Sequence, residues 1–262
     1  MASSRSVLIG DAIELRDYAP VLRWLILNCL AVVVVIALWY FGLLWAMLST
    51  DRTHISLLIL VLFTLTALHC LYQTADISNQ LVAARKVRAQ LAEFGAESLH
   101  IGDDGRVLLA NGRPLAPGVL AAHIGNLVRK AQARRGGPLD QMLLLRTLAD
   151  RLRNREKLGL FVSEGLLRLA LLGTAIGFIL MLIPIARLTS FDPGTLRLAL
   201  SGMTGGMAIA LNVTVTGIGS ALVLKFEYFL LDDAISDLFE TVTETTEVYV
   251  VPALETRHDA RS

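Results

Sequence analysis

Small polar side chains recur in the last two apolar stretches of the chain, where they could line a path for water or ions. Asn212, Thr216 and Ser220 are spaced by four residues, so they form one stripe along a helix. Thr174 lies in the preceding stretch. Amide and hydroxyl oxygens can solvate an ion, so we interpret these four residues as candidate pore-lining positions. The alternative is that each hydroxyl bonds to its own helix and only helps to pack it.

Small residues at helical spacing accompany this stripe. Gly173 and Gly177 lie in one stretch, and Gly206 and Ala210 lie in the next, each pair separated by four positions. This spacing allows membrane helices to approach closely. We therefore predict that these four residues pack helices together.

Ionisable residues avoid the apolar stretches. None of the 23 acids lies inside one, and Glu227 follows the end of the last. A group that binds and releases a cation at membrane depth needs a charge there. His69 does lie within a stretch, and we predict an interhelical or interfacial hydrogen bond for it rather than a proton relay. The chain alone is therefore predicted to move protons poorly.

Patterns typical of enzymes and metal sites are not found in the sequence. It has no nucleophile and base pair, phosphate loop or metal-ligand spacing of a known kind. Cys29 and Cys70 fall in apolar stretches, where free cysteine behaves as a small hydrophobic residue. We expect no enzymatic activity, no metal and no cofactor.

The elements that must position these residues are membrane helices. Hydrophobic residues make up 54% of the 262 residues and charged residues 18%, and the mean hydropathy is +0.59, which is unusual for a water-soluble protein. Four stretches without charge are long enough to cross about 30 Å of hydrocarbon. They pair into two hairpins: Trp24–Thr50 with Ile55–Ala75, and Leu169–Ala186 with Leu198–Leu224.

The distribution of basic residues predicts the orientation. Of the 24 Lys and Arg residues, fifteen lie between the hairpins in residues 76–168, three in residues 1–23, three from Lys225 onward and three in the two hairpin loops. The positive-inside rule then places both termini and the middle segment in the cytoplasm. We therefore expect a multi-pass membrane protein.

The middle segment is expected to combine helices with a small β-hairpin. A polar helix is predicted over Asp76–Phe94, and short apolar runs at Ser98–Ile101 and Arg106–Ala110 predict a hairpin packed on adjacent helices. Helix is then predicted over Pro117–Arg134 and from Leu139 straight into the third stretch.

After the fourth stretch, an amphipathic helix is predicted to extend the last span. The expected fold is thus an all-α membrane protein with four spans in two hairpins and a helical insert with a small β-hairpin. The expected domains are residues 1–23, 24–75, 76–160, 161–228 and 229–262: the cytoplasmic N-terminal segment, first hairpin, cytoplasmic insert, second hairpin and cytoplasmic tail.

Three motifs of the second hairpin resemble the paired helices of the MotA/TolQ/ExbB proton-channel family. They are Leu171-Leu172-Gly173-Thr174-Ala175-Ile176-Gly177, Ala199-Leu200-Ser201-Gly202 and Thr214-Val215-Thr216-Gly217-Ile218-Gly219. The resemblance covers residues 166–228. It implies the stator of an ion-driven motor in the bacterial inner (cytoplasmic) membrane: a ring, with five copies suggested, around a MotB/TolR/ExbD-like single-span partner whose Asp carries the proton. It also implies that Thr174 and Thr216 face the pore.

The chain departs from the pattern of this family in its details. Leu211, followed by Asn212, stands where ExbB-like proteins carry a glutamate, and four spans are similar to MotA rather than to the three-span branches. The resemblance leaves open the system that is driven and whether the ion is proton or sodium. The alternative function is a non-conducting membrane scaffold that assembles a multiprotein complex. A solitary transporter is disfavoured by the absence of charge within the spans.

Overall fold

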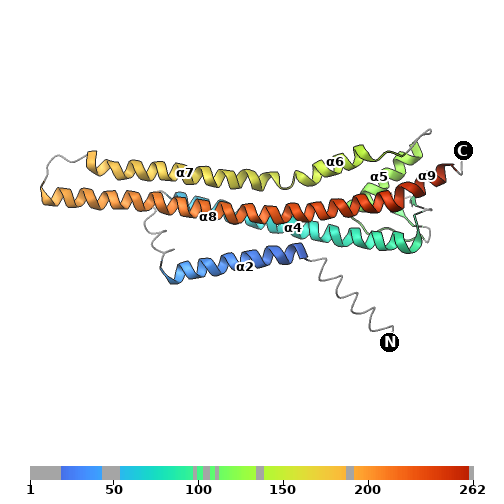
Figure 1. Cartoon of the computed structure of the whole chain (residues 1–262), viewed down its shortest axis with the longest axis horizontal. Coiled ribbons are helices and arrows are strands. Elements are labelled where there is room, and N and C mark those ends of the chain that lie inside the picture. Colours follow the sequence, from blue (N-terminus) through green and yellow to red (C-terminus); the bar gives the residue numbers. More distant parts are fainter. Residues whose placement is uncertain are drawn as a thin grey trace, which may run out of the picture. The chain divides into compact units, whose positions relative to one another are not determined.

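The structure is a computed structural model that describes residues 19–42, 54–96, 99–102, 107–109, 112–133, 139–186 and 192–259. Helices form nearly all of the described chain (Figure 1). In chain order the elements are α2 (Ala19–Tyr40), α4 (Ile55–Phe94), β1 (His100–Ile101), β2 (Val107–Leu108), α5 (Val119–Ala133), α6 (Met142–Arg153), α7 (Lys157–Ala186), α8 (Pro193–Thr245), the π-helix η1 (Thr246–Val250) and α9 (Val251–Asp259).

Four helical segments are long and apolar enough to cross a membrane, which confirms the prediction of four membrane-length apolar helices. They contain α2 with 22 residues, α4 with 40, α7 with 30 and α8 with 53. A helix needs about 20 residues to span the hydrocarbon, so each is sufficient. The α2 helix ends at Tyr40, and the last part of the first apolar stretch, residues 43–50, lies outside the described residues.

The chain divides into two compact units. Residues 23–72 and 156–230 form what we call the apolar unit, which holds most of the membrane-length segments. Residues 1–22, 73–155 and 231–262 form the polar unit. Helices α4 and α8 are continuous and contribute residues to both units.

The polar unit has an aliphatic core built on α4, α5 and the later part of α8. As predicted, the helix over 76–94 forms, with Leu81, Val87 and Leu91 buried and Val82 half-buried. Each fully buried side chain of this type stabilises the fold by about 1.5–3 kcal/mol. The predicted amphipathic extension is also confirmed. From residue 231 onward the acids of α8 stay largely exposed, whereas its apolar face is buried and consists of Leu231, Ala234, Ile235, Leu238 and Val242.

The β-hairpin predicted for the middle segment is confirmed, and it belongs to the polar unit. Strands β1 and β2 are antiparallel, with His100 opposite Leu108 and Ile101 opposite Val107. They pack on α5, where a Cβ added at Gly125 would lie 3.4 Å from Val107. An isolated hairpin is marginal in water, so this contact accounts for its formation. The turn residues 103–106 lie outside the described residues.

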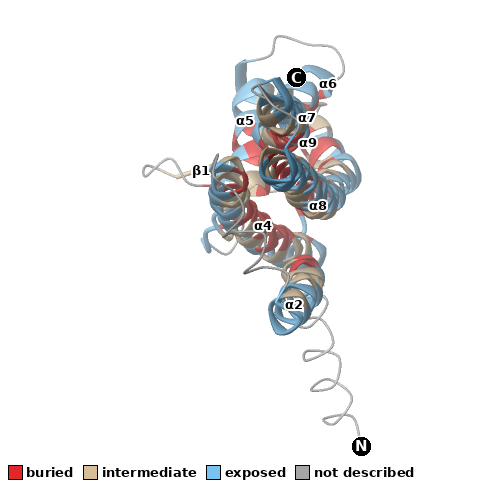
Figure 2. Ribbon diagram, turned by 90° about the vertical axis from the view of Figure 1, so that its left-hand side faces the viewer, coloured by how far each residue is buried: buried red, intermediate tan, exposed pale blue. Residues whose placement is uncertain are grey.

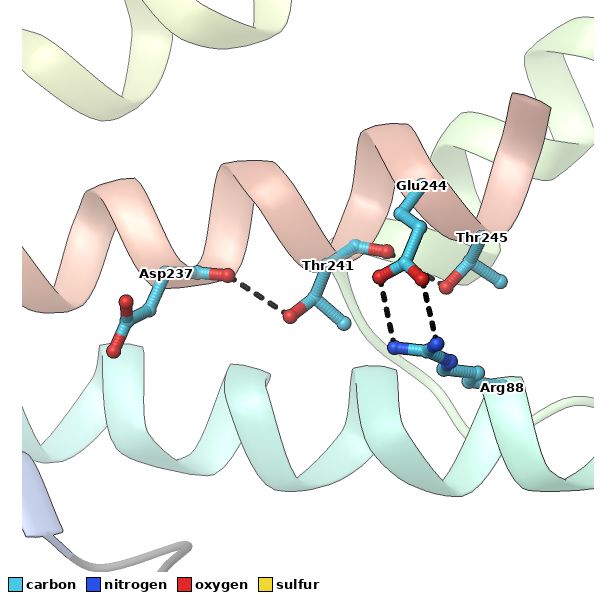
Figure 3. A network of polar contacts seen from close by, with 5 residues as sticks. All are labelled: Arg88, Asp237, Thr241, Glu244 and Thr245. Carbon is cyan, nitrogen blue, oxygen red and sulfur yellow. Dashed lines mark hydrogen bonds and ion pairs between the residues drawn. The ribbon is translucent and has the colours of Figure 1, made fainter. Parts of the chain in front are cut away.

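Polar side chains hold neighbouring helices of the polar unit together. The Gln80 side chain of α4 accepts a hydrogen bond of 2.9 Å from the backbone N–H of Val119, at the start of α5, where a helix has unsatisfied donors. On the outside, the Arg88 guanidinium makes two hydrogen bonds of 2.9 and 2.7 Å to the Glu244 carboxylate of α8 (Figure 3). Thr241 and Thr245, on the same part of α8, each donate to a carbonyl four residues earlier.

One helix differs from its prediction. The helix expected to run from Leu139 into the third apolar stretch is interrupted, because α6 ends at Arg153 and α7 begins at Lys157. Arg155, within the interruption, contacts the Asp76 carboxylate and donates to Gln73 at 3.3 Å. This contact with α4 favours a turn where helical periodicity alone predicts continuation.

Candidate functional site

Helices α7 and α8 lie side by side (Figure 1) and approach closely because glycines face backbone across the contact. A Cβ added at Gly177 would lie 2.7 Å from the Ala210 backbone nitrogen, and one added at Gly206 would lie 2.4 Å from the Met181 nitrogen. Real Cβ atoms essentially never come within 3.0 Å of another atom in this way. Only glycine therefore permits this helix separation.

The same contact continues toward the start of α7 and along the following turns of α8. An added Cβ at Gly173 would lie 2.2 Å from Val213, and the Ser163 hydroxyl donates to the Ala221 carbonyl at 3.1 Å. Close packing of small residues and the Ser163 hydrogen bond thus join α7 to α8 in the described residues, a kind of contact that is common between membrane helices. These predicted packing residues lie in the contact: Gly173, Gly177, Gly206 and Ala210.

The predicted pore-lining residues lie on these two helices, and three of them are half-buried. Thr174 donates to the Leu171 carbonyl at 2.6 Å, and Thr216 donates to the Asn212 carbonyl at 2.8 Å. Asn212, Thr174 and Thr216 are half-buried, whereas Ser220 is buried. Each threonine hydroxyl uses its hydrogen within its own helix, and its oxygen retains acceptor capacity for a further donor.

Apolar side chains cover the remaining faces of the hairpin and are exposed in the single chain. Leu171 is 68% exposed and Val215 is 64% exposed. In the burial view, α2 is also largely exposed or half-buried (Figure 2). Exposed apolar surface of this extent requires lipid or other chains around it.

Glu227, which follows the end of the last apolar stretch in the sequence, is an acidic residue that the fold buries. The Glu227 side chain is fully buried, and its Oε1 accepts a 3.0 Å hydrogen bond from Nδ2 of Asn28 on α2. Its Oε2 has no hydrogen-bond partner in the described part of the chain. The indole Nε1 of Trp24 faces the same carboxyl group without reaching hydrogen-bond geometry.

Next to this carboxyl group, Tyr228 joins α8 to α4 and α7. Its hydroxyl lies 3.0 Å from Nδ1 of His69, which is the interhelical hydrogen bond that we predicted for that histidine. A Cβ added at Gly159 would lie only 1.9 Å from the Tyr228 ring. A glycine on α7 therefore makes room for the aromatic ring.

A signal for Glu227 was present in the spacing of small and apolar residues. The buried positions of α8 recur every three or four residues through Gly217, Leu224 and Leu231, and Glu227 falls on the same face. Extending the period past the end of the charge-free stretch would have placed this acid in the buried face. Asn28, its partner, lies inside the first apolar stretch.

Comparisons with protein-family models, with curated proteins and with solved structures found no match to this chain.

Proposed function

We propose that this chain is the stator and proton-channel subunit of an ion-driven motor in the bacterial inner membrane. Copies of the chain form a ring, with five as the expected number, around a MotB/TolR/ExbD-like single-span partner. An Asp of the partner carries the proton, and proton flow drives relative movement of the two subunits. Both termini of the chain lie in the cytoplasm in this proposal.

The observation that supports the proposal most is the pairing of the family-like motifs on α7 and α8. Gly173 and Gly177 face Val213 and Ala210, so the helix that carries Thr174 packs against the one that carries the Asn212 stripe. A hydroxyl-lined wall can solvate a moving ion, while a carboxylate from another chain holds the proton. The exposed apolar faces of the hairpin are available to further copies and to lipid.

A non-conducting scaffold is the second candidate, and one observation favours it. The hydroxyls of Thr174 and Thr216 both donate to carbonyls of their own helices. Threonines satisfied in this way need no ion path to explain them. The same glycine contacts would then serve assembly alone.

Proton uptake by sealed vesicles tests the proposal. A trapped pH dye would report potential-driven uptake for the chain alone and for the chain reconstituted with a neighbouring single-span chain that carries one membrane Asp. We expect slow uptake by the chain alone and fast uptake with the partner. Fast uptake by the chain alone, or no acceleration by the partner, would overturn the two-component stator.

Substitution of two threonines, one at a time, distinguishes a pore-lining role from a packing role in the same assay. Thr216→Val removes a hydroxyl from the candidate pore stripe, and Thr214→Val removes one with the same 2.8 Å bond to its own helix, two positions away. Valine keeps the shape of threonine. We expect uptake to drop markedly in Thr216→Val and to persist in Thr214→Val, with ring assembly intact in both, as mass determination in nanodiscs would show. Equal behaviour of the two variants would favour the scaffold.

A further inference from the structure

Among the residues that the structure describes, Glu227 is the only acidic side chain that is buried. Its two carboxyl oxygens differ: Oε1 accepts from the Asn28 amide at 3.0 Å, and Oε2 is buried without a partner. A carboxylate that leaves water without a cation or a full set of hydrogen bonds is much more costly to bury than the neutral acid. This asymmetry within one side chain needs an explanation.

We propose that Glu227 is a proton-binding site of this chain, with the acid proton on Oε2 and with Asn28 as the residue that positions the group through Oε1. The inference goes beyond the proposed function because it needs neither a ring nor a partner. Glu227 would give the chain a proton-binding carboxyl group, which the four charge-free stretches lack.

Among the described residues, no lysine or arginine forms an ion pair with Glu227. Helix α2 contributes Asn28 and Trp24 beside the carboxyl group, whereas His69 and Cys70 of α4 lie beside the neighbouring Tyr228. Helix α7 contacts this part of α8 through two uncharged residues, Gly159 and Ser163. On α8 itself Tyr228 is the neighbour. The side chains of the nearest basic residues in the sequence are exposed: Arg23 and Lys225.

The donor set also favours a proton over a metal cation. The atoms that face the carboxyl group are Nδ2 of Asn28 and Nε1 of Trp24, and both are N–H donors. A cation such as Na⁺, Mg²⁺ or Ca²⁺ needs several oxygen ligands around it. Donors can bond to a carboxyl oxygen, but they repel a metal ion. A proton bound to one oxygen requires no further ligand.

Infrared spectroscopy of the purified full chain at neutral pH tests the proposal in a detergent without ester groups, such as dodecyl maltoside, because lipid esters absorb in the same region as a protonated acid. Exposed carboxyl groups are ionised at this pH, because their pKa values lie near 4. A protonated acid has a carbonyl stretching band that a carboxylate lacks. We expect this band in the unmodified chain and its complete loss in Glu227→Gln.

Two controls assign the band. Glu164→Gln removes an exposed carboxylate of α7 that pairs with Arg168, so the band should remain. Asn28→Leu removes the donor to Oε1, so the band should persist and move to higher frequency. A band that is unchanged in Glu227→Gln, or no band in the unmodified chain, would overturn the proposal.

A measurement without substitution covers the case in which Glu227→Gln does not fold. Incorporation of ¹³C-labelled glutamate into the unmodified chain must shift the band to lower frequency, and an unshifted band would overturn the assignment. None of these measurements uses ion flux or a partner. If the partner fails to accelerate proton uptake but the Glu227 band is present, only the stator proposal is contradicted. If the partner accelerates uptake but the Glu227 band is absent, only the proton-binding site is contradicted.

Discussion

The apolar and polar units are both built from packed helices, but different contacts hold them. In the apolar unit, α7 and α8 touch through glycines that face backbone atoms, such as Gly206 against Met181, while large apolar side chains remain exposed. In the polar unit, aliphatic side chains such as Leu81 and Leu238 are fully buried, and charged groups lie outside. Close contact between helix backbones therefore characterises the apolar unit, and burial of apolar side chains away from water characterises the polar unit.

The difference is explained by lipid as the expected surroundings of the apolar unit and water as those of the polar unit. Burying a leucine gains free energy when the alternative is water, but little when the alternative is lipid, so membrane helices depend on close packing instead. The polar unit should therefore tolerate surface changes and respond to loss of its core. The apolar unit should respond most strongly to an added methyl group at a backbone contact.

The largest effect is expected for Gly206→Ala. The new Cβ would lie 2.4 Å from the backbone nitrogen of Met181, so α7 and α8 must separate. Overpacking of this kind costs about 1–3 kcal/mol. We expect a lower thermal unfolding temperature in detergent and impaired assembly of the membrane complex, measured by scanning fluorimetry and native mass determination.

Gly205→Ala is the matched control for this prediction. A Cβ at Gly205 would have nothing within 4 Å, and alanine has a higher helix propensity than glycine. Its stability should equal or slightly exceed that of the unmodified chain. If Gly205→Ala and Gly206→Ala behave alike, close backbone packing is not what holds α7 to α8.

A smaller, pH-dependent effect is expected in the polar unit. Burial lowers the pKa of His123 below its ordinary value of 6.5, and its hydrogen bond of 3.3 Å to Gln141 only partly opposes this shift. The unfolded chain therefore binds a proton more readily than the folded chain. The stability that neutral His123 contributes is complete above pH 6.5 and is lost as the pH falls through the lowered pKa.

Thermal unfolding on either side of pH 6.5 measures this contribution. The double variant His123→Leu/Gln141→Leu replaces the buried pair with apolar groups, so its unfolding temperature should depend less on pH than that of the unmodified chain. His100→Gln, which removes an exposed histidine of the β-hairpin, should retain the pH dependence of the unfolding temperature. An unchanged dependence in the double variant would show that other groups cause it.

The smallest effect is expected for the ion pair in Figure 3. Arg88 and Glu244 form a two-pronged contact, but their side chains are 41% and 48% exposed, so water and salt weaken the attraction. A double-mutant cycle with Arg88→Gln and Glu244→Gln should give a coupling free energy of less than about 1 kcal/mol. A substantially larger coupling would mean that charge, as well as apolar burial, holds the polar unit together.

The elements that were predictable from the sequence depend on local patterns. Long charge-free stretches predict spans because lipid cannot satisfy backbone groups. The change of period at Ser98, followed by turn residues, predicts the β-hairpin. The break between α6 and α7 was not predictable, because it depends on the contact of Arg155 with α4, a partner 79 residues away.

By itself, the sequence determined that the chain has four membrane-length helical segments, a polar insert with a hairpin and an amphipathic extension of the last helix. Hydrophobicity and periodicity are properties of neighbouring residues, so no tertiary structure is needed to detect them. Only the tertiary structure decided that Glu227 is buried against Asn28, which lies 199 positions earlier. A sequence shows that a carboxyl group follows an apolar stretch, but its solvation depends on which helix covers it.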